Sequence, residues 1–220
     1  MPMLTLYTYF RSSAAFRVRI ALALKGLPHD SAFIHLVRDG GQHRSAAYQA
    51  INPQQLVPAL RTEDGSVLTQ SLAIMEYLDE AYPDAPALLP ADALGRARVR
   101  ALAQAVACEV HPLNNLRVLH YLTQHLGVSE AQKTAWYHHW VREGLGAIET
   151  MLTQEGATGR FCHGDTPTLA DCCLVPQVFN ARRFACPLED YPTIGRIVQA
   201  CEALPAFAQA APAQQPDAAA

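Results

Sequence analysis

Two adjacent serines, Ser12 and Ser13, follow a short apolar strand pattern at residues 4–7 and precede a helix pattern that stops at Gly26. They therefore lie where a strand leads into a helix N-terminus, which offers unpaired N–H groups and the positive end of the helix dipole. This position favours an anion, including a thiolate, whose pKa falls in such a setting. A serine that only caps the helix, with Ser13 as the cap, explains the same residues.

A second candidate binding element is the dipeptide Val57-Pro58, where proline takes the first position of a predicted strand. A cis peptide bond here would expose the backbone N–H and C=O of Val57 to an extended ligand, whereas a trans bond would make Pro58 an ordinary edge residue. Gln70 and Ser71 open another predicted helix, whose first turn suits a ligand with a carboxylate and an amine. Capping of this helix by Ser71 accounts for the same pair.

Polar side chains interrupt two predicted helices in the second half of the chain. His111 and Asn115 are one helical turn apart and are followed by Arg117. Arg182 and Arg183 occupy the middle of an otherwise apolar helix pattern. An arginine can hold a carboxylate through two parallel hydrogen bonds, but a solvated helix face or a structural salt bridge explains these residues as well.

Other motifs indicate folding rather than chemistry. Residues 168–171 fit a capping box, with a threonine hydroxyl at the N-cap and an aspartate three positions later. The six cysteines lack the spacing of a zinc site and the nine histidines lack neighbouring ligands, so we predict free thiols and no metal. The sequence also lacks a glycine-rich phosphate loop and a Gly-x-Ser-x-Gly elbow, which excludes the common nucleotide-binding and hydrolase motifs.

The composition is that of a globular protein without the charge of a nucleic-acid binder. The chain has 220 residues, half of them hydrophobic, which suits one large domain or two small ones. Its net charge of −3 indicates no basic surface for nucleic acid. No apolar run approaches the roughly 20 residues that span a bilayer, and no secretory signal is recognisable, so we expect a cytoplasmic protein without a membrane partner.

Strand and helix patterns alternate over residues 1–81, a proline-rich linker follows at 82–91, and only helix patterns remain over 92–220. We therefore predict an α/β domain followed by an all-α domain. A bend is expected at Pro112, because proline removes one helical hydrogen bond. The tail from Ala208, rich in alanine, proline and glutamine, is expected to be frayed. The predicted strands are 4–7, 31–36, 57–61 and 66–69, and the predicted helices include 44–50, 92–126 and 130–154.

The order of these features resembles the glutathione transferase superfamily over nearly the whole chain. Residues 9–22 are similar to the zeta-class signature, in which Ser-Ser-Cys is followed two residues later by Arg-Val-Arg-Ile-Ala-Leu. Segments 52–58, 111–115 and 181–184 are similar to segments of the zeta-class maleylacetoacetate and maleylpyruvate isomerases. The resemblance implies a thioredoxin-like N-terminal domain, an all-α domain that binds substrate, and a homodimer.

The resemblance also implies glutathione as the cofactor. The Val57-Pro58 bond would be cis, and the backbone of Val57 would pair with the cysteinyl part of glutathione. Gln70 and Ser71 would hold its γ-glutamyl end. Further contacts with glutathione are implied for four positions: His43, Gln55, His111 and Asn115.

Ser12 is expected to donate a hydrogen bond to the glutathione thiolate, with Ser13 beside it. The next residue is Ala14, where the family has cysteine, so a mechanism that needs this thiol is excluded. Arg11 completes the predicted catalytic set. Since the substrate would carry two acidic ends, three arginines are its candidate anchors: Arg11, Arg117 and Arg183.

These inferences predict a glutathione-dependent cis–trans isomerase that converts maleylacetoacetate to fumarylacetoacetate in aromatic catabolism. Maleylpyruvate isomerisation is an alternative, because the two substrates share the maleyl end. A glutathione-conjugating transferase or a peroxidase would use the same glutathione site without the arginine anchors. A non-enzymatic binding protein on the same scaffold is a further alternative, since a fold does not fix a function.

Overall fold

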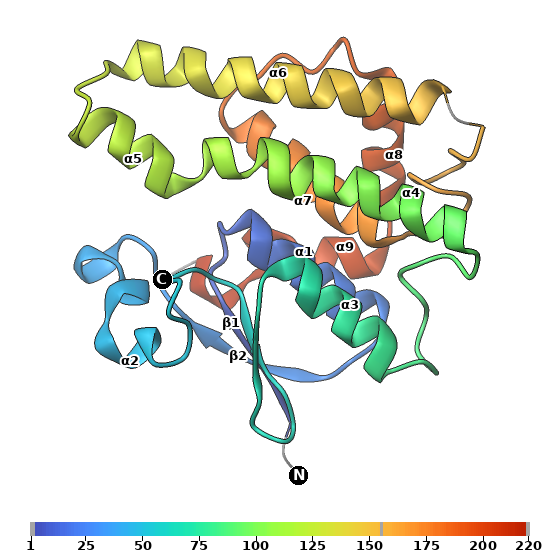
Figure 1. Cartoon of the computed structure of the whole chain (residues 1–220), viewed down its shortest axis with the longest axis horizontal. Coiled ribbons are helices and arrows are strands. Elements are labelled where there is room, and N and C mark those ends of the chain that lie inside the picture. The colour runs from blue at the N-terminus through green and yellow to red at the C-terminus, as the bar shows by residue number, and fades with distance from the viewer. Residues whose placement is uncertain (1–2, 155, 219–220) are drawn as a thin grey trace. The chain divides into compact units, whose positions relative to one another are not determined.

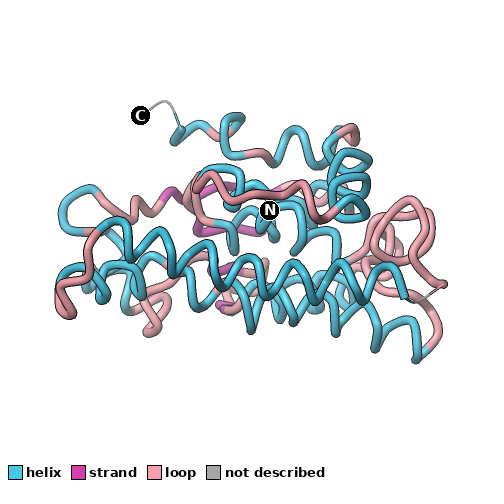
Figure 2. Tube along the Cα trace, turned by 90° about the horizontal axis from the view of Figure 1, so that it is seen from above, coloured by secondary structure: helices cyan, strands magenta, loops and turns pink. Residues whose placement is uncertain are grey.

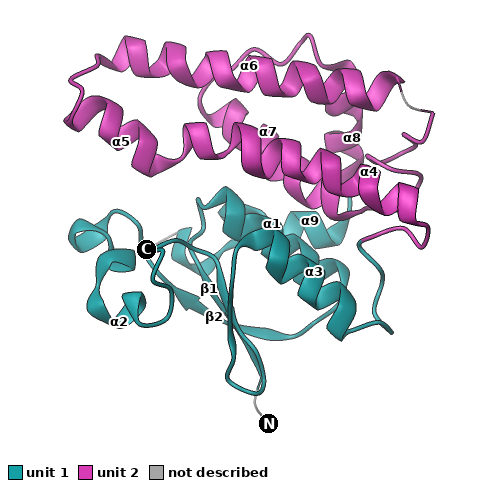
Figure 3. Cartoon of the chain, in the orientation of Figure 1, with its two compact units in different colours: residues 1–88, 203–220 teal, residues 89–202 magenta. Residues whose placement is uncertain are grey.

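The computed structural model describes residues 3–154 and 156–218 (Figure 1). The chain divides into two compact units (Figure 3). Unit 1 contains residues 1–88 and 203–220, and unit 2 contains residues 89–202. This division differs from the predicted boundaries, because the C-terminal segment belongs to the N-terminal unit and not to the helical one.

Unit 1 is built on a four-stranded mixed sheet with the strand order β2-β1-β3-β4. The first two strands are parallel, and the other two neighbouring pairs are antiparallel. The order of elements, β1-α1-β2 followed by α2 and β3-β4-α3, is the predicted thioredoxin-like arrangement. The bounds are β1 Leu4–Thr8, α1 Ser13–Leu24, β2 His29–Phe33, α2 Ala46–Gln49, β3 Ala59–Arg61, β4 Val67–Thr69 and α3 Ser71–Ala81.

The second strand begins two residues earlier than predicted. Its register is fixed by β1, since Leu4 pairs with His29 and Thr8 pairs with Phe33. Only two of the five residues of β2 are half-buried and the other three are exposed. The pattern of apolar residues in this segment is therefore a weak indicator of where the strand begins and ends. Pairing with a buried neighbour therefore determines where this strand begins.

Helix α1 is buried on nearly every side, and even Arg17 and Arg19 are only 2% and 4% exposed. It packs against α3 and against α9, which contains Pro205–Ala210. The predicted apolar face of α1, with its four-residue period, accounts for only part of this burial. Packing of α9 from the C-terminal segment adds to the burial of α1.

Residues 208–218 are ordered, so the predicted fraying from Ala208 is wrong for this stretch, and residues 219–220 lie outside the described residues. Phe207 and Ala210 of α9 are buried, and two 3₁₀ turns follow at Pro212–Gln214 and Pro216–Ala218. The many alanines of this segment have short side chains, which allow its backbone to lie close to α1. Composition alone suggested a loose tail, whereas the packing partner lies almost two hundred residues earlier in the chain.

Unit 2 is helical, as predicted. Figure 2 shows the helices of the whole chain in cyan. Apart from an isolated bridge between Thr158 and Gly164, its described residues form no strand. Helix α7 packs against α4 and α8, and α6 packs against α8. No described helix is both long and apolar enough to cross a membrane. The bounds are α4 Ala93–Gln104, α5 Leu116–Gln124, α6 Glu130–Gln154, α7 Leu169–Arg183 and α8 Pro192–Glu202.

The predicted bend at Pro112 is part of a longer irregularity. A π-helical turn at Ala105–Val110 precedes the proline, and a 3₁₀ turn at Pro112–Asn114 follows. The backbone N–H of His111 donates to the carbonyl of Val106 at 2.9 Å, which is a π-type bond. The bend therefore begins before the proline that the sequence indicated.

Candidate functional site

Ser12 is the N-cap of α1, and Ser13 is the first helical residue. The Ser12 Oγ accepts a hydrogen bond from the N–H of Ala15 at 3.2 Å. The expected cap was Ser13, which is instead buried. A serine hydroxyl that accepts a backbone hydrogen bond still has its own hydrogen to donate. Ser12 is half-buried, so this hydrogen can reach a ligand.

The first turn of α1 also offers unused backbone donors. Within the described part of the chain, the N–H groups of Ser13 and Ala14 have no acceptor, and the first turn of the helix holds no acidic residue. The positive end of the helix dipole adds to these donors. The start of α1 therefore suits an anion next to the Ser12 hydroxyl.

The Val57-Pro58 peptide bond is cis, as the resemblance implied. The N–H and C=O of Val57 form no hydrogen bond with another described residue, although the side chain is buried. The preceding carbonyl, of Leu56, accepts hydrogen bonds from the Tyr48 hydroxyl and from the Asn52 Nδ2, each at 2.7 Å. This segment is therefore held in place while the Val57 backbone remains available to an extended ligand.

Helix α3 begins at Ser71, as predicted, but Ser71 is not its N-cap. The N-cap position is Gln70, with φ of 69° and no capping hydrogen bond from its side chain. A left-handed backbone is uncommon for a residue other than glycine and is concentrated at functional sites. The Gln70 Nε2 donates to Gln54 Oε1 at 2.8 Å.

The Ser71 hydroxyl is oriented by a buried arginine of α1. Arg17 donates from Nη1 to Ser71 Oγ at 3.1 Å. Since this bond uses the oxygen as an acceptor, the hydroxyl hydrogen of Ser71 must point elsewhere and can serve a ligand carboxylate. The Arg17 side chain thus connects α1 directly to the start of α3.

His43 lies in a 3₁₀ turn at Gln42–Arg44, and its Nδ1 is buried without a hydrogen-bond partner among the described residues. Burial lowers the pKa of His43, and the charge of Arg44 lowers it further, so both effects favour the neutral ring. Gln55 lies on the loop before Val57, is half-exposed and has φ of 55°. Both predicted positions belong to unit 1.

The predicted polar residues of unit 2 form their own group. The Asn115 Nδ2 lies 3.4 Å from the His111 Nε2, so these side chains meet as expected, although they are separated by the 3₁₀ turn and not by one turn of a regular helix. Asn115 also caps α5, because its side chain accepts the N–H of Arg117 at 3.1 Å. One asparagine therefore orients the histidine and begins the helix that carries the arginine.

The three candidate anchors for substrate are exposed arginines: Arg11, Arg117 and Arg183. Over residues 3–154 and 156–218, none of them forms an ion pair. Arg183 donates to Asn180 Oδ1 at 3.2 Å. Its neighbour Arg182 is different, because it binds Glu202 at 2.6 Å. The structural salt bridge considered for this pair therefore involves Arg182 and leaves Arg183 available for an anion.

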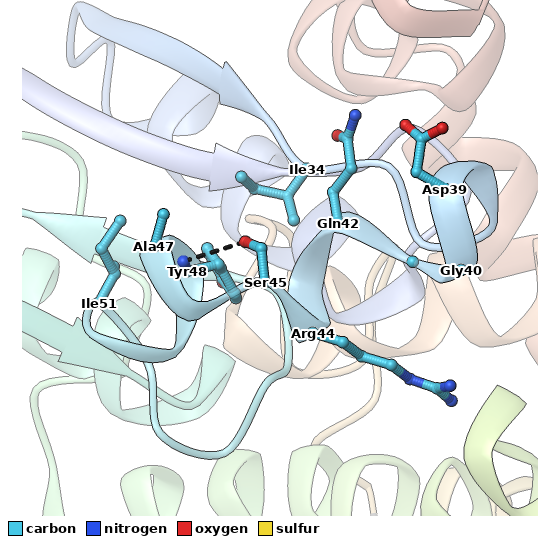
Figure 4. Close-up of a pocket in the computed structure, with 10 residues that line it drawn as sticks. Ile34, Asp39, Gly40, Gln42, Arg44, Ser45, Ala47, Tyr48 and Ile51 are labelled. Carbon is cyan, nitrogen blue, oxygen red and sulfur yellow. Dashed lines mark hydrogen bonds between the residues drawn. The ribbon is translucent and has the colours of Figure 1, made fainter.

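A pocket of about 480 Å³ lies between the end of β2 and α2 (Figure 4). Ile34, Tyr48 and Ile51 form apolar parts of its wall, and Ser45 in the wall accepts the N–H of Tyr48 at 3.2 Å. None of the predicted binding residues lines this pocket. We therefore assign it no role in binding the anion at α1. Among the described residues, no group of three histidine, cysteine or acidic side chains could hold a metal ion.

Comparison with known proteins identifies the family. The profile described as glutathione S-transferase, N-terminal domain, matches residues 11–81, and the one described as glutathione S-transferase, C-terminal domain, matches residues 134–208. A solved maleylpyruvate isomerase, described as a bacterial glutathione transferase of the zeta class, is 52% identical with a TM-score of 0.93. The match covers 97% of this chain and 99% of that chain. This chain belongs to the zeta class of glutathione transferases.

Two further relatives support this assignment. Maleylacetoacetate isomerase of Pseudomonas aeruginosa is 51% identical over 212 residues, which cover 96% of this chain and 97% of that protein. The structure of maleylacetoacetate isomerase from Methylobacterium extorquens AM1, with bound malonate and glutathione, is 43% identical with a TM-score of 0.92. The match covers 98% of this chain and 100% of the chain from Methylobacterium extorquens AM1. The predicted family and fold are thus confirmed.

The structure of this zeta-class transferase reveals supporting residues that the sequence interpretation missed. Arg17 orients Ser71, while Tyr48 and Asn52 fix the carbonyl that precedes Val57. The available signal for Arg17 was a charged residue inside an otherwise apolar helix pattern. No comparable local signal distinguished Tyr48, because its partner carbonyl is defined only after the loop has folded.

Replacing Gly41 with alanine is expected to displace His43. Gly41 has φ of 98°, and an added Cβ would collide with the His43 ring carbon Cε1 and lie 2.8 Å from Nδ1. It would also lie 3.0 Å from the carbonyl oxygen of Leu36, which as backbone cannot easily move. We expect a loss of about 1–3 kcal/mol in the free energy of unfolding, measured by urea unfolding, and weaker glutathione binding, measured by calorimetry.

Gly40→Ala is the matched control, because nothing lies within 4 Å of its added Cβ although its φ is also positive. Equal losses in both variants would contradict the role of the ring contact.

Proposed function

We propose that this zeta-class transferase is a glutathione-dependent cis–trans isomerase that converts maleylacetoacetate to fumarylacetoacetate in aromatic catabolism. The observation that carries the proposal is the start of α1, where the Ser12 hydroxyl and two unused N–H groups form a site for a thiolate. Identity of 51% over nearly the full length of a maleylacetoacetate isomerase supports the reaction. The protein is proposed to act in the cytoplasm as a homodimer.

The chain's own residues fit glutathione. Its cysteinyl part needs a strand-like partner, and the unpaired backbone of Val57 before Pro58 provides one. Its γ-glutamyl end carries a carboxylate and an amine, which suit the Ser71 hydroxyl and the Gln70 side chain at the start of α3. On the family resemblance we assign further contacts to four residues: His43, Gln55, His111 and Asn115.

Bound glutathione supplies a thiolate that adds reversibly to the maleyl double bond, so that rotation becomes possible before the thiolate is released. Ser12 donates its hydroxyl hydrogen to the sulfur, and the N–H groups of Ser13 and Ala14 add to the stabilisation of negative charge. The chain offers no thiol of its own here, because Ala14 replaces the family cysteine. Of the six cysteines, only Cys108 is exposed, and it lies in unit 2.

The substrate carboxylates are assigned to Arg11, Arg117 and Arg183. Each of these guanidinium groups is exposed and has no acidic partner within the described residues. A free guanidinium can bind a carboxylate through two hydrogen bonds. Bound malonate in the relative from Methylobacterium extorquens AM1 is consistent with a dicarboxylate-type substrate in this class.

Replacing Arg183 with alanine is expected to raise KM for the maleyl substrate roughly tenfold and to leave glutathione affinity unchanged. Initial rates and calorimetric titration with glutathione measure the two effects separately. Arg182→Ala is the matched control, because Arg182 is engaged with Glu202 at 2.6 Å and should affect neither quantity. Equal loss of substrate use and glutathione binding in the Arg183 variant would refute its role as a substrate anchor.

One assay tests the proposal against its alternatives. The loss of ultraviolet absorbance is followed for maleylacetoacetate and for maleylpyruvate, with and without glutathione. Glutathione-dependent loss with maleylacetoacetate at the higher kcat/KM is the expected result. Preference for maleylpyruvate would support the second candidate, which the 52% identity to a maleylpyruvate isomerase favours. Turnover of an electrophilic halide or a peroxide, without isomerisation, would instead identify a conjugating transferase or a peroxidase.

A further inference from the structure

The turn that leads into α1 is bonded to the far end of the chain. The backbone N–H of Phe10 donates to Oδ2 of Asp217 at 2.9 Å, although the two residues are 207 positions apart. Both belong to unit 1. Asp217 is only 8% exposed, and its Oδ1 has no hydrogen-bond partner among the described residues. Burying a carboxylate is costly unless it is paired, so the negative charge of Asp217 requires a compensating positive charge or further hydrogen-bond donors nearby.

Arg19 provides that compensation. Its guanidinium is buried and donates to the carbonyl oxygens of Tyr9 at 3.3 Å and Phe10 at 3.1 Å, while Nε donates to the carbonyl of Ala210 at 3.0 Å. Burial lowers the pKa of Arg19 to about 10, and the charge of Asp217 opposes this decrease. Arg19 therefore remains protonated at neutral pH, and its positive charge attracts the carboxylate of Asp217.

These contacts reach Ser12 through the backbone. The carbonyl of Tyr9 accepts the N–H of Ser12 at 2.9 Å in addition to the bond from Arg19. The turn before α1 is thus fixed at the carbonyls of Tyr9 and Phe10 and at the N–H of Phe10. Since the Ser12 hydroxyl takes its position from this turn, a shift of Phe10 would misplace the donor for the thiolate.

We propose that Asp217 is a positioning residue for the reaction, because it fixes the Phe10–Ser12 turn so that the Ser12 hydroxyl and the free N–H groups of α1 point at one anion. The inference deepens the proposed function and rests on it for the identity of that anion. The charge of Asp217 alone would have the opposite effect, since a nearby carboxylate disfavours a thiolate. A substitution that removes the charge but retains an acceptor therefore separates positioning from electrostatics.

The test uses three variants of the full chain: Asp217→Ala, Asp217→Asn and Gln214→Ala. Asparagine keeps an oxygen that can accept the Phe10 N–H. Gln214 is the matched control, because it is exposed in the same C-terminal segment and its side chain has no hydrogen bond among the described residues. Three quantities are measured: the pKa of bound glutathione from thiolate absorbance, kcat and KM for isomerisation, and hydrogen exchange of the Phe10 amide without ligand.

For Asp217→Ala we expect a thiol pKa raised by about one unit and a kcat lowered at least roughly tenfold with a KM changed less than about threefold. Exchange of the Phe10 amide should become at least about tenfold faster, because its acceptor is lost. Asp217→Asn should restore most of the kcat, slow the exchange again and leave the thiol pKa at or below that of the unmodified protein. Gln214→Ala should match the unmodified protein throughout.

Two results would overturn the inference. One is an Asp217→Ala protein with unchanged thiol pKa and kcat, and the other is an Asp217→Asn protein as impaired as Asp217→Ala. If the unmodified protein bound no glutathione, the proposed function would fail on its own. Exchange of the Phe10 amide in the ligand-free variants would still decide whether Asp217 holds the turn.

Discussion

Replacing Ser12 with alanine is expected to lower kcat/KM for isomerisation by about two to three orders of magnitude, the typical effect of removing one donor from a site that stabilises developing negative charge. The Ser12 Oγ already accepts the N–H of Ala15 at 3.2 Å, so its hydrogen is the one hydroxyl donor that we assign to the thiolate. Without it, the pKa of the bound thiol rises and less thiolate is present at neutral pH. The absorbance assay and the thiolate titration measure both effects.

The Ser12 substitution also removes an N-cap, which costs about 1 kcal/mol in stability, and a matched control separates this loss from catalysis. Asp92 caps α4 by accepting the N–H of Gly95 at 2.7 Å. Asp92→Ala should therefore destabilise the protein to a similar extent and leave kcat/KM unchanged. Ser12→Thr, which retains a hydroxyl and a capping side chain, should keep part of the activity. Equal activity in Ser12→Ala and Asp92→Ala would show that Ser12 only caps the helix.

Replacing Asp171 with alanine is expected to lower the free energy of unfolding by about 3–5 kcal/mol. Asp171 is completely buried and accepts the N–H of Cys162 at 2.9 Å, the N–H of Thr168 at 2.7 Å and the Thr168 hydroxyl at 2.9 Å. Burial raises the pKa of Asp171, and these donors oppose that increase. Alanine would leave all three donors buried without an acceptor. Urea unfolding monitored by fluorescence and circular dichroism measures the loss.

Asp165→Ala is the matched control for Asp171, since both aspartates lie close together in the sequence. Asp165 is exposed and accepts a single backbone hydrogen bond, from Arg160 at 2.9 Å. Its replacement should cost less than about 1 kcal/mol, because water can satisfy the donor. An Asp171→Ala protein as stable as Asp165→Ala would contradict the assignment of residues 168–171 to folding.

The local features of this protein could be predicted from its sequence. The capping box is present as predicted, with the Asp171 carboxylate accepting the backbone N–H of the N-cap residue Thr168 at 2.7 Å. The start of α3 at Ser71 and the strand-helix junction at Ser12 were also correctly located. Each of these features depends on side chains within a few residues of the backbone groups that they satisfy, so a short window of sequence contains the relevant information.

The sequence located the starts of α1 and α3 but did not identify which residue is the N-cap of each helix. The expected caps were Ser13 and Ser71, whereas the structure has Ser12 and Gln70 at these positions. Adjacent serines have the same capping preference, and only the backbone angles of the folded turn distinguish them. The side chain of Ser71 is used by Arg17, which is 54 positions away in the chain.

The sequence by itself determined the alternation of strands and helices, the helix N-termini that suit an anion and, through the resemblance, the family. Only the tertiary structure decided that residues 203–220 belong to unit 1, that Arg17 orients Ser71 and that Asp217 holds the turn before Ser12. Periodicity and capping act over a few residues, and their pattern is therefore visible in the sequence. A contact such as that between Phe10 and Asp217 joins residues with no local relationship, and it forms where the C-terminal segment, which packs on α1 through α9, meets the turn before α1.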